Sequence, residues 1–124
     1  MPEAVEEFAR AYMAAQKDAW ELGDFAGLRS LERADVKFSN INGTVFAGRD
    51  AHFAAIEGMK SSFGNAAMKQ EWQYLMGSGT VFSLSYEWSV QTPGEPLTIA
   101  GILVGRIEND QLVEEWGANY SVDR

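Results

Sequence analysis

The first part of the chain has the hydrophobic spacing of a helix. Six apolar residues and one amide recur at intervals of three and four, and these residues are Val5, Phe8, Ala9, Tyr12, Gln16, Ala19 and Trp20. At 3.6 residues per turn, these intervals place all seven on one helical face. The helix is expected to end at Gly23, because glycine readily adopts the left-handed conformation of a C-cap. Asp24 is a suitable N-cap for a short second helix that carries Phe25, Leu28 and Leu31.

The next segment shows first the alternation of a strand and then the spacing of a helix. Val36, Phe38 and Asn40 alternate with polar residues and predict a short strand. The dipeptide at residues 42–43 is Asn-Gly, a strong signal for a two-residue hairpin turn. A third helix is expected over residues 48–63, where the spacing of apolar residues returns to that of a helix.

From about residue 70 onward the pattern has a period of two. One expected strand has a face formed by Gln70, Trp72, Tyr74 and Met76. The next has an entirely apolar face formed by Phe82, Leu84, Tyr86, Trp88 and Val90. Two further strands are expected over residues 97–107 and 112–122, with turns at residues 92–95 and 109–110.

These elements predict an α+β fold. Three N-terminal helices pack on a strongly curved, mainly antiparallel sheet, and the 124 residues form a single domain, 1–124. Gly101, Gly105 and Gly117 interrupt the last two strands and are typical of bends or bulges. Such a sheet curls around the covering helix, and one helix cannot fill the wide end of the curl, so we expect an internal pocket there.

Composition excludes several kinds of function. The chain has 18 acidic and 10 basic residues, a net charge of −8, which argues against binding to nucleic acid or to anionic membranes. It has no cysteine and one histidine, which excludes thiolate and multi-histidine metal sites, and we expect no cofactor. No apolar run approaches the length of a membrane span, and the acidic start is unlike a signal peptide, so a cytoplasmic location is expected.

Three amides are candidates for contact with a ligand. Gln16 lies between Tyr12 and Trp20 on the apolar helical face, where an unpartnered amide would cost about 1–3 kcal/mol. Either a backbone group or buried water satisfies it, or it is rotated to the edge of the face, or it binds a ligand at the pocket floor. On this basis Gln16→Leu should keep the fold or stabilise it. Asn40 and Asn119 lie on expected strands, where Asn is disfavoured; Asn40 suits a strand end and Asn119 suits the pocket.

The acid/base candidates are Glu115, His52 and Tyr12. A carboxylate is usually solvated, but if Glu115 faces the cavity, desolvation would raise its pKa and make it a usable general acid or base. His52 is either a surface or helix-cap residue or a proton shuttle. The aromatic residues Trp72, Tyr86 and Trp88 are core residues, or they form a wall that selects flat ligands.

The last strand has two unlike faces. Glu115 and Asn119 lie on a more polar face, and Trp116 and Tyr120 lie on an apolar one. If the polar face lines the pocket, the apolar face needs cover, and a second subunit would supply it. We therefore expect a homodimer.

Four segments carry a resemblance to a known family. They are Trp-Glu-Leu-Gly-Asp-Phe-Ala-Gly-Leu at 20–28, Ala-Asp-Val-Lys-Phe at 34–38, Gly-Arg-Asp-Ala-His at 48–52, and Ile-Glu-Asn-Asp-Gln-Leu-Val-Glu-Glu-Trp at 107–116. In this order they resemble the nuclear transport factor 2-like superfamily, and within it the SnoaL-like polyketide cyclases and the ketosteroid isomerases. The resemblance implies a cone-shaped α+β barrel whose curved sheet wraps one long helix, often dimeric, with a ligand pocket inside its open end.

The three catalytic roles of the ketosteroid isomerases are all vacant here. The isomerases' tyrosine, general-base aspartate and oxyanion-hole aspartate correspond to Gln16, Asn40 and Leu103. An amide cannot act as a base and leucine has no proton to donate. The cyclases' acid falls at Asn119 or the next residue, which leaves Glu115 as a displaced carboxylate. The resemblance also implies that four alternate residues of one strand face the pocket, namely Phe82, Leu84, Tyr86 and Trp88.

Two functions follow from the sequence. The first is binding of an apolar or aromatic small molecule, with cofactor-independent acid/base chemistry of the isomerase, dehydratase or cyclase type. The second is a non-catalytic module that binds a ligand or a protein. The sequence leaves open whether the protein is an enzyme. An open cavity that contains Glu115 and Asn119 would favour the first, and a cavity filled by aromatic side chains would favour the second.

Overall fold

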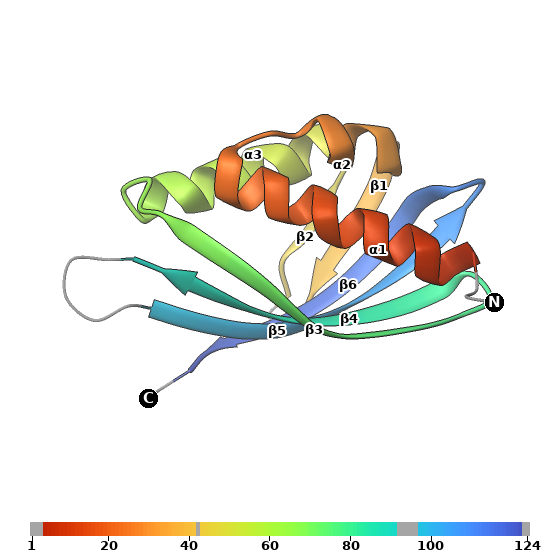
Figure 1. Cartoon of the computed structure of the whole chain (residues 1–124). Helices are drawn as coiled ribbons and strands as arrows, with labels where there is room; N and C mark the ends of the chain where they lie inside the picture. The colour runs from red at the N-terminus through yellow and green to blue at the C-terminus, as the bar shows by residue number, and fades with distance from the viewer. Residues whose placement is uncertain (1–3, 42, 92–96, 123–124) are drawn as a thin grey trace.

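The structure is a computed structural model that describes residues 4–41, 43–91 and 97–122. Its helices are α1 (Ala4–Lys17), the π-helical turn η1 (Asp18–Leu22) that follows it, α2 (Ala26–Leu31) and α3 (Arg49–Ser62). Its strands are β1 (Glu32–Asn40), β2 (Val45–Ala47), β3 (Met68–Ser78), β4 (Val81–Val90), β5 (Leu97–Glu108) and β6 (Gln111–Ser121). The helices lie on one face of the sheet, which they cover as a layer (Figure 1). The expected α+β class is confirmed.

The strands form one mixed sheet in the order β2-β1-β6-β5-β4-β3. Strands β3 to β6 form the antiparallel meander that the alternating pattern predicts. Strand β1 pairs in parallel with β6, the last strand of the chain. Strands β2 and β3 are the two edges, so the sheet is not closed into the barrel expected from the sequence.

The apolar face of α1 packs on the inner face of the sheet, as its spacing predicts. Phe8, Tyr12 and Phe82 form an aromatic cluster with ring centroids 5.9–6.3 Å apart. A Cβ atom at Gly105 would lie 2.4 Å from the Phe82 ring, and one at Gly101 would lie 2.4 Å from the Tyr86 hydroxyl. These two glycines therefore make room for aromatic rings of the neighbouring strand.

A bulge reverses the two faces of β3. The pairing with β4 shifts register between Trp72 and Tyr74, so that Leu75 rather than Tyr74 continues the inner face. Tyr74 is 74% exposed and Met76 is 69% exposed. The sequence-based expectation that these two share a buried face with Trp72 is wrong, because one extra residue in a strand inverts every later side chain.

Two of the expected chain reversals are confirmed. Gly23 has φ +72° and its N–H donates to the Ala19 carbonyl, which ends the helical segment. Asn109 and Asp110 both have positive φ, as a tight turn between antiparallel strands requires. The expected turn at residues 92–95 lies outside the described residues, as does Asn42. Of the helices in the described ranges, none has the length and apolar character that a membrane span needs.

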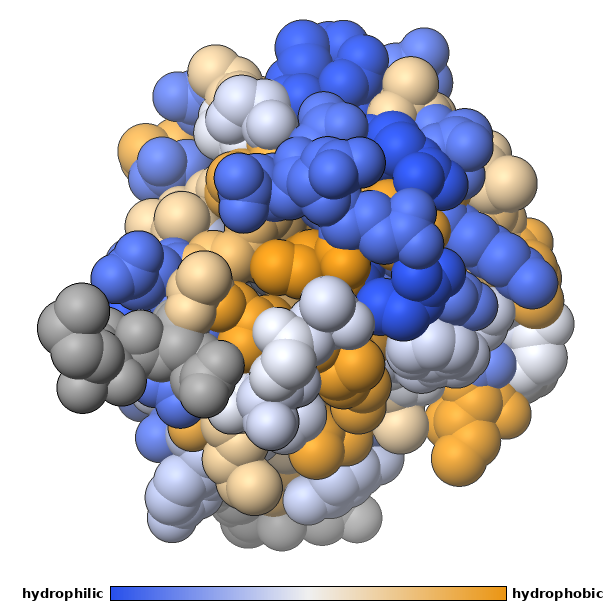
Figure 2. Space-filling view, turned by 90° about the vertical axis from the view of Figure 1, so that its right-hand side faces the viewer, coloured by the Kyte–Doolittle hydropathy of each residue, from blue (hydrophilic) through white to orange (hydrophobic). Residues whose placement is uncertain are grey.

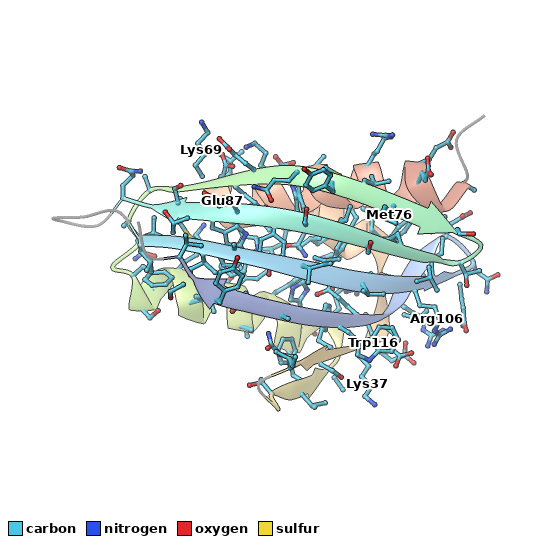
Figure 3. The ribbon with its side chains drawn as sticks, turned by 90° about the horizontal axis from the view of Figure 1, so that it is seen from below. Lys37, Lys69, Met76, Glu87, Arg106 and Trp116 are labelled. Atoms are coloured by element: carbon cyan, nitrogen blue, oxygen red, sulfur yellow. The ribbon has the colours of Figure 1, made fainter. Side chains whose placement is uncertain are left out.

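The outer face of the sheet carries both charged and large apolar side chains (Figure 3). Glu87, Arg106, Met76 and Trp116 extend from it, away from the helices. Trp116 and Tyr120 of β6 are both exposed. Of the two faces of this strand that the sequence distinguishes, the apolar one is therefore the outer face. At the end of the molecule that holds the β3–β4 and β5–β6 turns, hydrophilic residues cover the helical layer and hydrophobic residues are exposed below it (Figure 2).

Candidate functional site

A cavity of about 320 Å³ lies between the helical layer and the inner face of the sheet. Its lining residues come from α1, η1, α3 and all strands of the sheet. Expected site residues among them are Gln16, Asn40, His52, Trp72, Tyr86, Trp88, Leu103, Glu115 and Asn119. The other lining residues are Trp20, Phe38, Ser39, Thr44, Phe46, Ala55, Ile56, Met59, Gln70 and Gly117.

Three expected site residues lie behind this lining. Phe82 and Leu84 are buried in the core and do not line the cavity, although the resemblance placed them there. They are on the inner face of β4, but in its first half, where α1 covers the sheet. Tyr12 is also fully buried and reaches the cavity only through the residues to which it is hydrogen-bonded.

A chain of hydrogen bonds leads from η1 to β6. The indole Nε1 of Trp20 donates to Oε1 of Gln16 over 2.9 Å. The Gln16 Nε2 donates to the Tyr12 hydroxyl over 2.7 Å, and that hydroxyl donates to Oε1 of Glu115 over 2.7 Å. The four-residue spacing on the helical segment brings the first three side chains together, and the sheet supplies the fourth.

The Trp20 indole fixes which group donates and which accepts in each of these hydrogen bonds. An indole N–H can only donate, so the Gln16 oxygen is the acceptor and its NH₂ group is the donor. The Tyr12 oxygen accepts from that NH₂ group, so its own proton is directed at Glu115. Glu115 therefore receives a hydrogen bond that stabilises its ionised form, at a fixed oxygen.

Glu115 is an acidic side chain that lines the cavity, and its surroundings shift its pKa. Burial raises its pKa to about 7, and the nearby Glu32 charge adds to this. The charge that His52 carries when it is protonated and the Tyr12 hydrogen bond act in the opposite direction. Near neutral pH the carboxyl group exists in both protonation states, which is what a general acid or base requires.

His52 lies in the first turn of α3 and is paired with a residue of β1. Its Nδ1 lies 2.8 Å and 3.0 Å from the two carboxylate oxygens of Glu32. The Glu32 side chain is completely buried, and burial raises its pKa while His52 counteracts the effect. The His52 ring also packs on Phe38, with centroids 4.1 Å apart. A surface position for His52 is excluded, because its side chain is buried.

Asn119 is placed by a row of residues across three strands. Tyr86 of β4 is opposite Gly101 of β5, and Gly101 is opposite Asn119 of β6. Because Gly101 has no side chain, the Tyr86 phenol extends over it and hydrogen-bonds to Asn119. Burial raises the pKa of Tyr86, so the phenol stays protonated. Asn40 ends β1, the position that the sequence favours for it, and it also lines the cavity.

The aromatic wall is continuous from η1 to β3. Trp20 packs on Trp88 with ring centroids 4.0 Å apart, and Tyr86 packs on Trp72 at 5.5 Å. The cavity remains open beside these rings. Such walls favour flat apolar ligands, with a few polar groups to orient them.

Sequence reasoning missed two polar residues, Glu32 and Gln70. Glu32 precedes the alternating pattern of β1, and no signal in the sequence marks it as buried. Gln70 is on the alternating face of β3 with Trp72, and this pattern alone could have placed it on the cavity. Across the described ranges, no group of three or more histidine or acidic side chains is placed to hold a metal ion.

Solved structures share this fold. Bal32a, from a soil-derived mobile gene cassette, matches with a TM-score of 0.77 and 17% identity over 98% of this chain and 93% of that one. IdmH of Streptomyces antibioticus, a candidate polyketide cyclase, matches with a TM-score of 0.74 and 17% identity over 93% and 91%. An NTF2-like protein of Anabaena variabilis matches with a TM-score of 0.75 and 9% identity over 100% and 96%.

The amino-acid sequence itself matches no protein-family model and no curated protein. At these identities the structural likeness establishes the fold alone. The chain has the nuclear transport factor 2-like fold, which confirms the resemblance found in its sequence motifs.

Proposed function

We propose that this protein binds a flat, apolar or aromatic small molecule in the cavity and moves a proton on it, with Glu115 as the general acid or base. The 124 residues act as one domain, and the cavity is the internal pocket expected from the sequence. The observation that carries the proposal is the Glu115 carboxyl group, which opens on an aromatic-walled cavity and is held at one oxygen by Tyr12.

The chemistry follows from that environment. Glu115 in its ionised form accepts a proton from a carbon next to a carbonyl group, and the electron pair moves to the carbonyl oxygen as an enolate. Amide and phenol donors at Asn119 and Tyr86 stabilise such an oxygen. In an isomerisation, the protonated Glu115 returns the proton to another carbon of the enolate. In a dehydration it gives the proton to a hydroxyl group on the next carbon, which leaves as water when its C–O bond breaks. In an aldol-type cyclisation the enolate carbon forms a C–C bond with a second carbonyl group, whose oxygen takes the proton. The three reactions share the first step, and none of them needs a cofactor.

The fold agrees with this proposal but does not select the reaction. IdmH, which shares the fold, is a candidate polyketide cyclase. The positions that correspond to the acids of the ketosteroid isomerases are Gln16, Asn40 and Leu103, and all three line the cavity. Glu115 is therefore the acid on which we base the function of this chain.

The proposal can be tested without its natural substrate, by the elimination reaction of 5-nitrobenzisoxazole. In this reaction a base removes the ring C–H proton, the N–O bond breaks, and a nitrile and a phenolate form, whose absorbance is followed. We expect Glu115→Gln to lower the rate at least about a hundredfold, the size of a typical general-base contribution. The rate of the unmodified protein should rise as pH increases through about 7, because the ionised carboxylate is the base.

Glu114→Gln is the matched control. Glu114 is the neighbouring residue, but it pairs with Arg106 on the outer face of the sheet, so the change should leave the rate unaltered. Equal rates for the Glu115 and Glu114 variants would contradict a catalytic role of Glu115. If the elimination is not accelerated but aromatic compounds bind, the alternative function, a non-catalytic binding module, is favoured.

The homodimer stays a prediction. It is supported by the exposed apolar side chains on the outer sheet face, among them Trp116, Tyr120 and Ile102. Sedimentation equilibrium would contradict it by giving the mass of a single chain at micromolar concentration.

A further inference from the structure

The pair formed by Glu32 and His52 is unusual because both side chains are almost completely removed from solvent. Glu32 is 0% exposed and His52 is 6% exposed, yet His52 also lines the cavity. Removing a charged pair from water is costly, and an apolar pair of similar volume is often equally stable or more so. The pair joins β1 to α3, but two apolar residues would join them as well. Its presence beside the cavity calls for a reason other than stability.

The geometry of the pair fixes the protonation of the imidazole ring. An ionised carboxylate can only accept hydrogen bonds, so the Nδ1 that contacts both Glu32 oxygens carries a hydrogen. In the neutral ring the other nitrogen, Nε2, then has a lone pair and no hydrogen. Contacts with Phe38 and Phe46 hold the plane of the ring. Because Nδ1 is occupied, Nε2 is the nitrogen that can meet a ligand in the cavity.

We propose that Glu32 is a positioning residue, which holds His52 as the Nδ1–H tautomer so that Nε2 accepts a proton or a hydrogen bond from the ligand beside Glu115. This inference rests on the proposed function, since it takes the cavity as the ligand site. It also narrows the ligand class. Glu115 in its ionised form and His52 are both acceptors, so the complementary ligand is a flat apolar molecule with a hydroxyl or enol group at this end.

The tautomer can be measured directly, because His52 is the only histidine of the chain. With ¹⁵N-labelled histidine, the correlations between ring nitrogens and ring carbon-bound protons report which nitrogen carries the hydrogen. We expect the Nδ1–H form in the unmodified protein. In Glu32→Leu, which has no acceptor, the ring should change to the Nε2–H form. Asp50→Asn is the matched control, because Asp50 is an exposed acid in the same helical turn.

Two results would overturn the proposal. One is an Nε2–H tautomer in the unmodified protein, and the other is an Nδ1–H tautomer that persists in folded Glu32→Leu. The first result is decisive even if the leucine variant fails to fold. Neither measurement requires a ligand, so both are independent of the test of Glu115.

The ligand class is tested with 2-naphthol and naphthalene, which differ only in one hydroxyl group. We expect 2-naphthol to bind about tenfold more tightly, the value of one good hydrogen bond. The preference should fall to near unity in Glu32→Leu and in His52→Phe, which keeps an aromatic ring but lacks Nε2. A preference that is unchanged in both variants would overturn the role of Nε2. If neither compound binds, the proposed function itself is contradicted, whatever the tautomer.

Discussion

Gln16 and Gln70 are both glutamines and are buried to almost the same degree, but their side-chain amides differ in hydrogen bonding. Gln16 of α1 is 4% exposed and Gln70 of β3 is 3% exposed, and both line the cavity. Both polar atoms of Gln16 are hydrogen-bonded, the oxygen to Trp20 and the nitrogen to Tyr12. The Oε1 of Gln70 is buried and has no partner in the part of the chain that the structure describes.

The difference separates two parts of the cavity wall. From Trp20 to Glu115, each side chain of the hydrogen-bond chain is bonded to the next. On β3 and β4, Trp88 is opposite Gln70 in register, and its Nε1 likewise has no partner among the described residues. Buried polar atoms are nearly always hydrogen-bonded. The first part therefore holds Glu115 through hydrogen-bonded partners, and the second part contains buried polar atoms that we expect to lower the stability of the fold.

The largest effect in this comparison is expected for Gln16→Leu. The change leaves the buried Trp20 N–H without an acceptor and the Tyr12 hydroxyl without a donor, so we expect a loss of about 2 kcal/mol in the free energy of unfolding. This revises the expectation from the sequence, in which the same change was neutral or stabilising. Urea unfolding measures it, with Gln73→Leu at an exposed position of β3 as the control. Equal stabilities for the Gln16 and Gln73 variants would show that the hydrogen bonds of Gln16 contribute nothing to the free energy of unfolding.

A smaller effect of opposite sign is expected for Gln70→Leu. This change removes a buried oxygen that has no hydrogen bond in the described structure, so we expect a gain of about 1 kcal/mol in the free energy of unfolding. The same urea experiment measures it. If Gln70→Leu destabilises the protein as much as Gln16→Leu does, the two amides are equally satisfied and the comparison fails.

Local patterns in the sequence predict the elements of this fold well. The seven residues on the helical face are all buried, and the alternating residues of β4 all point inward. What the patterns miss depends on contacts between distant segments. The parallel pairing of β1 with β6 joins the first strand of the chain to the last. The bulge between Trp72 and Tyr74 is a property of the pairing with β4, and nothing in β3 alone marks it.

The candidate site was predictable to a similar extent. An amide on an apolar helical face indicates that Gln16 needs partners, but the acid at the end of its chain is about a hundred residues away in sequence. Glu115 could be placed on the polar face of its strand by alternation. Its partner Tyr12 could not be assigned, because the pairing depends on how α1 crosses the sheet. Glu32 was missed for the same reason, since only the packing of α3 on β1 brings it to His52.

The account depends most on the protonation of Glu115, and a ¹³C NMR titration of its side-chain carboxyl group measures this directly. Protein labelled in glutamate is titrated from pH 4 to pH 9, and the Glu115 resonance is assigned by its absence in Glu115→Gln. The account predicts a midpoint at about pH 7, because burial disfavours the carboxylate more than His52 and Tyr12 favour it. A midpoint near the ordinary value for glutamic acid, about 4.3, would show a solvated carboxyl group and contradict the account.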